Sequence, residues 1–366
     1  MGIPRSAMLN IAIWLVLVSV LLAGCTAPAA PTLAPAAPTA TPAASVTPVL
    51  QLTATLDKEL SVMIVDPTGL VTNVHDPTMI KTGGMYYLVS TGPGIPIHCS
   101  KDMKVWDSCG RVFSANPDWV VKAIEGVKDL WAPEIVFNDG RFYLFYAAST
   151  FGSNHSAIGL VTNATLDPKS PEYAWVDQGE VISSQKSDNY NAIDPNLALD
   201  KDGQPWLLFG SFWSGIKMVK VDPVTFKPTT GEKLISLAAN PNTDAIEGAF
   251  VTRRGDFYYL FVSHDFCCKG VMSSYNIRVG RSKDITGPYL DRDSKPLAEG
   301  GGTLVYKGSN RWRGPGHNSI YIEGDTYYMV YHSYDANANG VPTLRIEALE
   351  WDPDSWPQSP SALTGQ

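Results

Sequence analysis

The stretch HDPTMIKTGGMYYLVS, residues 75–90, contains the pattern that decides the fold. A short apolar run, opened by an acidic residue, leads to the pair Gly83-Gly84, and a run of aromatic and β-branched residues follows. Two glycines between apolar runs are a strong signal for a β-hairpin. The same order of segments begins again four times further along the chain, so this hairpin is the first of a series.

Each later repeat also has a short apolar run, a glycine-containing turn and an aromatic run, with different residues in each. They read WAPEIVF, DG and FYLFY within residues 131–146; IDPNLAL, DG and PWLLFGS within 193–211; IEGAFV, RG and FYYLF within 246–261; and GHNSIY, EG and TYYMVY within 316–331. Polar residues near their openings, at positions 76, 134, 194, 247 and 317, are separated by steps of 58, 60, 53 and 70 residues. Repeats of this length, each with room for about four strands, are typical of β-propeller blades. We therefore predict an all-β fold, a five-bladed β-propeller.

Three acidic residues lie among apolar neighbours near the starts of these repeats, namely Asp76, Asp194 and Glu247. Burial of a carboxylate costs free energy unless a partner or a function retains it. The first strand of each propeller blade lines the central channel, so polar residues that open these strands would gather at one mouth of it. One Asp before a Pro is often only a turn residue, but three acids at blade spacing favour a shared site. Glu134 follows a proline instead of preceding one, and we leave it out of this set.

Six motifs in this order resemble glycoside hydrolase family 43, and most closely its endo-1,5-α-L-arabinanases: HDPTMI, WAPE, STFGSN, NAIDP, EG and GHNS. The likeness covers residues 70–355. It implies that Asp76 is the general base that activates water and that Glu247 is the general acid. Asp194 would be the third carboxylate, which orients the acid and keeps it protonated. The fourth repeat departs from many relatives, because it has Glu-Gly-Ala where they have Glu-Ala-Pro or Glu-Gly-Pro.

The same resemblance implies how the site binds its ligands. Arabinan or an arabino-oligosaccharide would be bound by residues around the arabinose subsites: Asp76, Gly152, Asn191, Ser211, Phe212 and Trp213. Trp131, near the rim, either stacks on a sugar ring or packs in the core. His317 would help to hold a metal ion, usually calcium, largely through water, and its alternative role is that of a hydrogen-bonded packing residue.

The chemistry of inverting hydrolysis agrees with acids spread over several blades. It needs one carboxylic acid and one carboxylate roughly 6.5–9.5 Å apart, so that a water molecule fits between base and sugar. Carboxylates that face one another across a channel can meet this separation. This chemistry is compatible with an inverting glycosidase, and the resemblance implies that its substrate is arabinan, cleaved at internal α-1,5-L-arabinofuranosidic bonds.

Three alternatives to this function stay open. The first is an exo-acting α-L-arabinofuranosidase or β-xylosidase of the same family. The second is a non-catalytic surface lipoprotein that binds oligosaccharide, although binding alone needs no pair of acid and base. The third is a retaining five-bladed fructosidase, whose two carboxyl groups would lie only about 5 Å apart.

The first 25 residues have the pattern of a bacterial lipoprotein signal peptide. Arg5 precedes an apolar stretch at residues 9–22, and the sequence LAGC that ends at Cys25 resembles the lipobox, whose cysteine becomes lipidated. An ordinary signal peptide is the alternative. Residues 26–56 are rich in Ala, Pro and Thr, which is typical of an extended linker. We expect residues 57–366 to form an exported catalytic domain, held at the extracellular face of the cell membrane by lipidated Cys25.

The acidic charge balance argues against one class of partner. The formal net charge is −8, from 28 basic and 36 acidic residues. Removal of residues 1–24 takes away Arg5 alone among the charged residues, which leaves 27 basic against 36 acidic residues, or −9. Nucleic-acid binding needs a basic stripe, so we expect no nucleic-acid partner, while an uncharged polysaccharide is compatible with this charge. We expect a monomer.

Four further cysteines follow Cys25. Cys99 and Cys109 flank an apparent hairpin tip, so they could pair across it in an oxidising compartment. Cys267 and Cys268 are adjacent, and adjacent cysteines rarely bond to each other without strain. A metal site that these two would share with His264 is the alternative that the sequence suggests.

Overall fold

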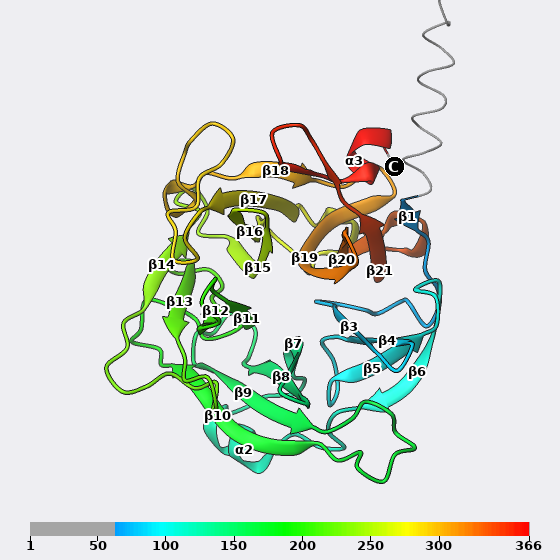
Figure 1. Cartoon of the computed structure of the whole chain (residues 1–366), viewed down its shortest axis with the longest axis vertical. Helices are drawn as coiled ribbons and strands as arrows, with labels where there is room; N and C mark the ends of the chain where they lie inside the picture. The colour runs from blue at the N-terminus through cyan, green and yellow to red at the C-terminus, as the bar shows by residue number, and fades with distance from the viewer. Residues whose placement is uncertain (1–62, 366) are drawn as a thin grey trace, which may run out of the picture. The chain divides into compact units, whose positions relative to one another are not determined.

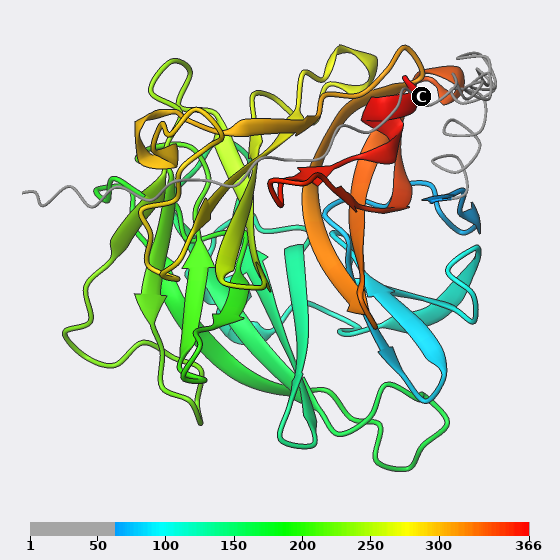
Figure 2. The same cartoon turned by 45° about the horizontal axis from the view of Figure 1, so that its top comes forward.

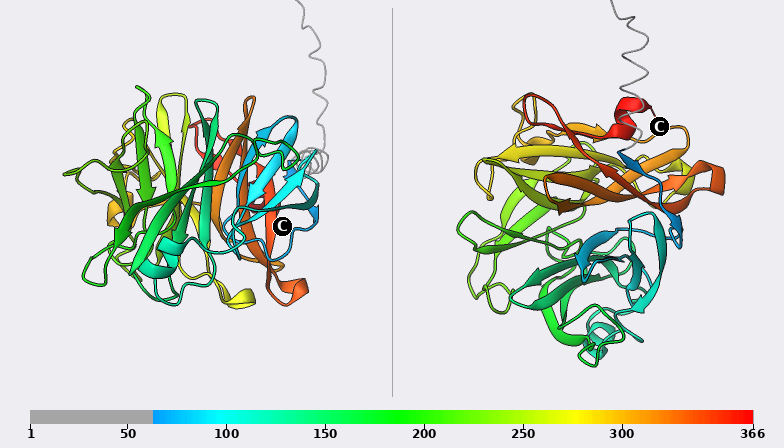
Figure 3. Two further views of the ribbon diagram at one scale, coloured as in Figure 1. Left: turned by 90° about the horizontal axis from the view of Figure 1, so that it is seen from below. Right: turned by 45° about the vertical axis from the view of Figure 1, so that its right-hand side comes forward.

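Five sheets surround one axis as the blades of a propeller, in a computed structural model that describes residues 63–365 (Figure 1). The predicted all-β, five-bladed fold is thus confirmed. The predicted signal peptide, Cys25 and the linker at residues 26–56 lie outside the described residues. Figures 2 and 3 show the strands of neighbouring blades running side by side along the axis. Between residues 63 and 365 we find no helix that is long and apolar enough to span a membrane.

Four blades are each built from four consecutive antiparallel strands, of which the first lies nearest the axis in Figure 1. Blade 1 contains β3 (Thr78–Thr82), β4 (Met85–Val89), β5 (Pro96–Ser100) and β6 (Val105–Arg111). Blade 2 contains β7 (Trp131–Asn138), β8 (Arg141–Ala148), β9 (Ser156–Asn163) and β10 (Val176–Ser184). Blade 3 contains β11 (Asn196–Leu199), β12 (Pro205–Phe209), β13 (Ile216–Lys220) and β14 (Ile235–Ala238). Blade 4 contains β15 (Ile246–Arg254), β16 (Phe257–His264), β17 (Asn276–Ser282) and β18 (Thr303–Tyr306).

The fifth blade is assembled from both ends of the described chain. It contains β19 (Trp312–Glu323), β20 (Thr326–Asp335) and β21 (Val341–Ala348), and β1 (Ile64–Val65) pairs antiparallel with β21 as its outer strand. The next strand, β2 (Thr68–Gly69), pairs in parallel with β6 at the outer edge of blade 1. The chain that precedes blade 1 therefore ties blade 5 to blade 1.

Short elements connect and cover the blades. They are α2 (Asp118–Ala123), the 3-10 turns η1 (Gly270–Met272), η2 (Leu297–Glu299) and η3 (Ala336–Ala338), the strand pair β22 (Glu350–Trp351) and β23 (Pro357–Gln358), and α3 (Pro360–Thr364). A disulfide joins Cys99 to Cys109 within blade 1, which answers a question that the sequence left open.

Five clusters of buried apolar side chains fill the five interfaces between neighbouring blades. The aromatic second strands supply both sides of these interfaces, because successive side chains of a strand point to opposite faces. In β16, for example, Tyr258 and Leu260 pack toward blade 3, whereas Tyr259 and Phe261 pack toward blade 5. This is why the middle of each second strand is a continuous apolar run instead of alternating with polar residues.

One residue near the start of each inner strand has a left-handed backbone. These residues, with φ between 43° and 59°, are Asp76, Ala132, Asp194, Gly248 and His317. The strand ladders are interrupted by register shifts next to three of them, in β7, β15 and β19. The blades therefore correspond at positions 76, 132, 194, 248 and 317. The correspondence that we predicted was wrong by two residues at Glu134 and by one at Glu247.

Candidate active site

One cavity, of about 860 Å3, lies where the inner strands begin. This volume is in the range of roughly 300–1,000 Å3 that is common for ligand sites. The structure brings all ten predicted site residues to its wall: Asp76, Trp131, Gly152, Asn191, Asp194, Ser211, Phe212, Trp213, Glu247 and His317. They come from all five blades, so the predicted convergence of distant repeats on one site is what the fold produces.

Asp76 lies among imidazole rings and is 8% exposed. Its Oδ1 is 2.8 Å from His75 Nδ1 and 3.1 Å from His317 Nδ1, and its Oδ2 accepts a hydrogen bond of 2.6 Å from the hydroxyl of Thr91. Burial alone would raise the pKa of Asp76, but His317 and His75 act more strongly in sum and hold it well below its ordinary value. Asp76 is therefore a carboxylate at neutral pH, as a base must be.

The backbone beside Asp76 is fixed from the neighbouring blade. The Asp76 N–H donates to His332 Nδ1 over 3.2 Å, so this nitrogen is unprotonated. His332 is fully buried, and its ring stacks on that of His75 with centroids 3.8 Å apart. Two other left-handed residues are held in the same way, because the N–H of Ala132 donates to Thr91 Oγ1 and that of His317 donates to Ser263 Oγ.

Asp194 is buried and accepts a hydrogen bond from the neighbouring blade. It is 5% exposed, and its Oδ2 accepts a hydrogen bond of 3.1 Å from the Gly248 N–H. Burial, followed by the negative charges of Glu247 and Asp76, raises the pKa of Asp194 well above its ordinary value. The glycine at 248 has a left-handed backbone, and a Cβ there would lie 3.1 Å from the backbone and ring of His317. A glycine at 248 thus suits this position, whereas nothing in the structure explains the alanine at 249.

Glu247 is held by two hydroxyl groups. Ser211 Oγ donates to its Oε2 over 2.6 Å, and Tyr275 Oη donates to its Oε1 over 2.6 Å. Tyr275 is fully buried, and burial followed by the charge of Glu247 raises its pKa well above the ordinary value. Sequence reasoning missed Tyr275, Thr91 and His332. A signal existed only for Thr91, which follows the end of a second strand by two residues, as Ser211 does.

Exposed aromatic rings form the outer wall of the cavity. Phe212 and Trp213 follow β12 with left-handed backbones at both residues, and Trp213 is 39% exposed. Such a pair of unfavourable conformations is typical of a functional site. The ring of Phe266 lies 6.2 Å from that of Phe212, and Phe151 is largely exposed. Flat exposed rings of this kind are suited to stacking on sugars.

Asn191 lines the cavity with a buried amide group. Its side chain is 3% exposed, and its Nδ2 donates to the carbonyl of Ser153. Its Oδ1 has no hydrogen-bond partner within residues 63–365. A buried acceptor without a partner costs free energy, so a substrate hydroxyl or a water molecule is expected to satisfy it.

Glu134 does not reach this cavity. It lines a separate cavity of about 290 Å3 further along the axis. Its Oε2 accepts a hydrogen bond from Thr78 and its Oε1 accepts one from Asn196. Burial raises its pKa to about 8. Its exclusion from the catalytic set agrees with this position.

The donors near His317 fit calcium only with the help of water. His75, Asp76 and His332 each offer one ligand atom, and these atoms lie within 4.8 Å of one another. His317 adds a further imidazole beside Asp76. Calcium prefers six to eight oxygen ligands, whereas imidazole suits zinc and similar metals. Calcium at this position would therefore need water for most of its ligands.

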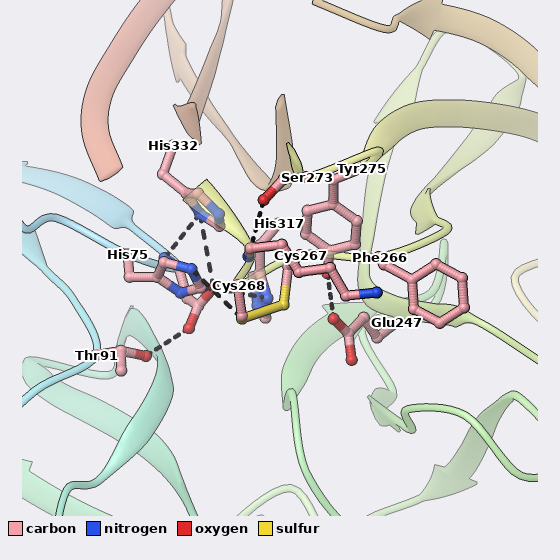
Figure 4. The surroundings of a disulfide bond; sticks show 12 residues. His75, Thr91, Glu247, Phe266, Cys267, Cys268, Ser273, Tyr275, His317 and His332 are labelled. Atoms are coloured by element: carbon pink, nitrogen blue, oxygen red, sulfur yellow. Dashed lines mark hydrogen bonds and ion pairs between the residues drawn. A yellow bond between two sulfur atoms is a disulfide. The ribbon is translucent and has the colours of Figure 1, made fainter. Parts of the chain in front are cut away.

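Cys267 and Cys268 are bonded to each other, against our expectation (Figure 4). Both line the cavity, in the loop between β16 and β17. A disulfide has no thiolate to offer, so the alternative of a metal site shared with His264 is not supported. The buried ring of His264 has its pKa lowered to about 4 by burial and by Arg278.

Comparison with known proteins gives a family and several close relatives. The sequence model of the family "Glycosyl hydrolases family 43" matches residues 70–357. The extracellular endo-α-(1→5)-L-arabinanase 1 of Bacillus subtilis is 46% identical over 290 residues, which cover 78% of this chain and 87% of the relative. The extracellular exo-α-(1→5)-L-arabinofuranosidase of Cellvibrio japonicus is 43% identical over 298 residues, 78% of this chain and 86% of the relative.

Two solved structures superpose on most of this chain. The Cellvibrio cellulosa α-L-arabinanase in complex with arabinohexaose superposes with a TM-score of 0.76 at 43% identity, covering 79% of this chain and 95% of that one. The endo-arabinanase from Bacillus licheniformis gives a TM-score of 0.75 at 43% identity, covering 80% and 99%.

Proposed function

The chain belongs to glycosyl hydrolase family 43, and from this membership we propose that it hydrolyses internal α-1,5-L-arabinofuranosidic bonds of arabinan with inversion of configuration. The observation that carries the proposal is the meeting of Asp76, Asp194 and Glu247, from three blades, at one cavity with exposed aromatic walls. Further support comes from the relative at 46% identity, which is named as an endo-arabinanase.

In the proposed reaction, Asp76 takes a proton from a water molecule, whose oxygen attacks the anomeric carbon. Glu247 gives its proton to the leaving glycosidic oxygen, so the bond breaks without release of a free alkoxide. The lowered pKa of Asp76 keeps the base ionised. Asp194 contributes through position, because it accepts the N–H of Gly248, the residue next to the acid.

Product analysis tests both the bond position and the stereochemistry. Linear debranched arabinan should give a mixture of oligosaccharides early in the reaction, and NMR should detect the inverted anomer first. Early appearance of arabinose or of one short product would instead indicate exo action. First appearance of the retained anomer would contradict inversion.

Exo action is the second candidate function. One observation favours it, since the Cellvibrio japonicus relative at 43% identity is named as an exo-acting arabinofuranosidase. The same time course separates the two candidates, because exo cleavage leaves the viscosity of arabinan nearly unchanged while reducing ends accumulate, whereas endo cleavage lowers the viscosity early.

We further propose that His317 helps to hold a calcium ion largely through water. A bound cation would supply positive charge beside Asp76. Ligand binding to the folded state stabilises it by RT ln(1 + [L]/Kd), so added calcium should raise the melting temperature of the wild type and not that of His317→Ala. If metal analysis of the purified protein finds no ion and calcium leaves the melting temperature unchanged, His317 is a packing residue.

For localisation we propose export followed by anchoring through lipidated Cys25. The two relatives above are named as extracellular, which supports export, and the LAGC sequence supports lipidation. A Cys25→Ser variant should move from the membrane fraction to the medium. Equal membrane association of both forms would contradict the anchor. The monomeric state stays a prediction.

A further inference from the structure

The Cys267–Cys268 disulfide lies beside the proposed base and has no role in the reaction described so far. Figure 4 shows it next to His75, whose Nε2 lies 3.9 Å from the sulfur of Cys268. Both cysteines line the cavity that contains Asp76 and Glu247. The loop that carries them is closed at its base, because the Ser274 N–H donates to the Phe266 carbonyl.

A chain of hydrogen bonds leads from this loop to Asp76. The Cys268 N–H donates to Tyr334 Oη over 2.8 Å, and the same oxygen is 2.8 Å from His75 Nε2. His75 Nδ1 is in turn 2.8 Å from Asp76 Oδ1. Stacking on His332 fixes the plane of the His75 ring, so the contact with Tyr334 is what turns its Nδ1 side toward Asp76.

The disulfide controls the first link of this chain for a covalent reason. A bond between adjacent cysteines closes a small ring that includes the peptide group between them, and the donating nitrogen of Cys268 is a member of that ring. Cys268 also has a left-handed backbone, with φ of 64°, which a residue with a side chain rarely adopts unless it is held there. Cleavage of the S–S bond would free the torsions that aim this N–H.

We propose that the Cys267–Cys268 disulfide is a positioning element of the active site, which aims the Cys268 N–H at Tyr334 so that Tyr334 holds His75 against Asp76. Tyr334 and His75 are then positioning residues as well. This inference rests on the proposed function, in which Asp76 activates water. Water activation is needed whatever group leaves, so a misplaced base should slow all substrates alike.

The test compares two double variants that each remove one disulfide. Cys267→Ser/Cys268→Ser should lower kcat on the order of tenfold, since small displacements of catalytic groups have effects of this size or larger. KM should change by less than about twofold, because uniform binding is not lost. The loss should be equal on arabinan and on an arabino-oligosaccharide with a nitrophenyl leaving group. Cys99→Ser/Cys109→Ser is the matched control, since that pair lies in β5 and β6 of blade 1, and it should keep wild-type kcat.

A dithiol reductant gives the second measurement, on the unaltered chain. Dithiothreitol supplies two electrons and two protons, becomes a cyclic disulfide, and leaves two thiols at Cys267 and Cys268. It should lower kcat of the wild type and of the Cys99/Cys109 variant, and it should have no further effect on the Cys267/Cys268 variant. It should also have little effect on Tyr334→Phe, in which kcat is already low, because two changes to one chain of contacts are not additive.

Several outcomes would overturn the inference. An unchanged kcat in folded Cys267→Ser/Cys268→Ser would do so, as would a raised KM with unchanged kcat, which would make the disulfide only a part of the substrate wall. A full reductant effect in Tyr334→Phe would show that the disulfide acts by another route. Should the variant not fold, the reductant series on the wild type and on Cys99→Ser/Cys109→Ser decides. If the wild type does not cleave arabinan at all, the proposed function fails instead.

Discussion

At the scale of single residues, the partners of each carboxyl group distinguish the three acids of the cavity. Asp76 has imidazole nitrogens and the hydroxyl of Thr91 around it. Asp194 has one backbone N–H, and Glu247 has two hydroxyl groups. Carboxyl groups whose surroundings push their pKa values apart can serve as acid and base at one pH. The lowered pKa of Asp76 suits the base, whereas the raised pKa of Asp194 belongs to the positioning acid and not to the proposed proton donor, Glu247.

Substitution of the acid and of the base should affect two substrates differently. Glu247→Gln should lower kcat on arabinan by roughly 10²- to 10⁴-fold, the usual contribution of a general acid. It should be less damaging on an arabino-oligosaccharide with a nitrophenyl leaving group, which needs little protonation. Asp76→Asn should be equally damaging on both, since water must be activated in each case. Steady-state kinetics on the two substrates check this, and a loss of equal size for Glu247→Gln on both would remove it from the acid role.

Gly316 should be sensitive because it packs against the partner of the acid. A Cβ at Gly316 would lie 2.1 Å from the ring of Tyr275, whose hydroxyl donates to Glu247. Gly316→Ala should therefore displace Tyr275, lower kcat by more than about tenfold, and cost on the order of 1–3 kcal/mol of stability through overpacking.

Gly280→Ala is the matched control for this effect. A Cβ there would lie 2.2 Å from Leu297, in the interface between blades 3 and 4. It should lower the melting temperature to a similar extent and leave kcat unchanged. Equal losses of kcat in the two variants would mean that overpacking between blades in general, rather than displacement of Tyr275, is responsible.

At the scale of the elements, hairpin signals and aromatic strands were enough to predict five blades, because both depend on local sequence. The sequence did not predict which residues of the different blades occupy corresponding positions. In the structure Ala132 corresponds to Asp76, which moves Glu134 two residues along the inner strand and out of the site. A bulge of this kind leaves no clear mark in one sequence, since left-handed Ala132 is an unfavourable choice that only the surrounding fold imposes.

The parts of the site that escaped prediction come from other elements than the inner strands. Tyr275 precedes β17 and His332 lies in β20. They contact the cavity residues Glu247 and Asp76 from behind, and His332 does so from a neighbouring blade. Contacts between residues so far apart in sequence depend on tertiary structure. The three acids could be placed at one site because each lies at or next to the corresponding position of its repeat.

The outer strand of blade 5 gives a prediction at this scale. β1 supplies the fourth strand of that blade, and Val65 packs against the apolar interface between blades 5 and 1. A chain that begins at Asp66 should melt at a lower temperature than one that begins at Met63, because the edge of β21 loses its partner. For a domain of this size about 1 kcal/mol corresponds to roughly 2–4 °C. Identical melting curves for the two chains would show that β1 does not close the propeller.

At the scale of the whole molecule, the blades are joined by hydrogen bonds around the axis below the site. Thr78 of blade 1 and Asn196 of blade 3 both donate to Glu134 of blade 2. Asn196 Oδ1 also accepts the N–H of Val251 in blade 4, and Ser319 of blade 5 donates to the carbonyl of Pro77. This set links all five blades, and two of its hydrogen bonds end on the buried carboxyl group of Glu134. The stability of the propeller can therefore depend on the protonation of Glu134.

Glu134 should make the folded protein less stable as the pH rises. Burial raises its pKa from 4.5 to about 8, so between these values the folded state keeps a proton that the unfolded state releases. The stability that this group contributes is present below about pH 4.5 and is lost as the pH rises through about 8.

The variant Glu134→Gln tests this dependence. It keeps the shape of the side chain and can donate from Nε2 to Thr78 while Oε1 accepts from Asn196. It should therefore match the wild type near pH 5 and exceed it near pH 8, where each unit of pKa difference corresponds to about 1.4 kcal/mol. Melting temperatures of the two forms between pH 5 and pH 8 measure the difference. Glu125→Gln is the control, because Glu125 is exposed. Because Asp194 is present in both forms, its own titration cancels in the comparison, and parallel curves for wild type and Glu134→Gln would mean that Glu134 is ionised in the folded protein.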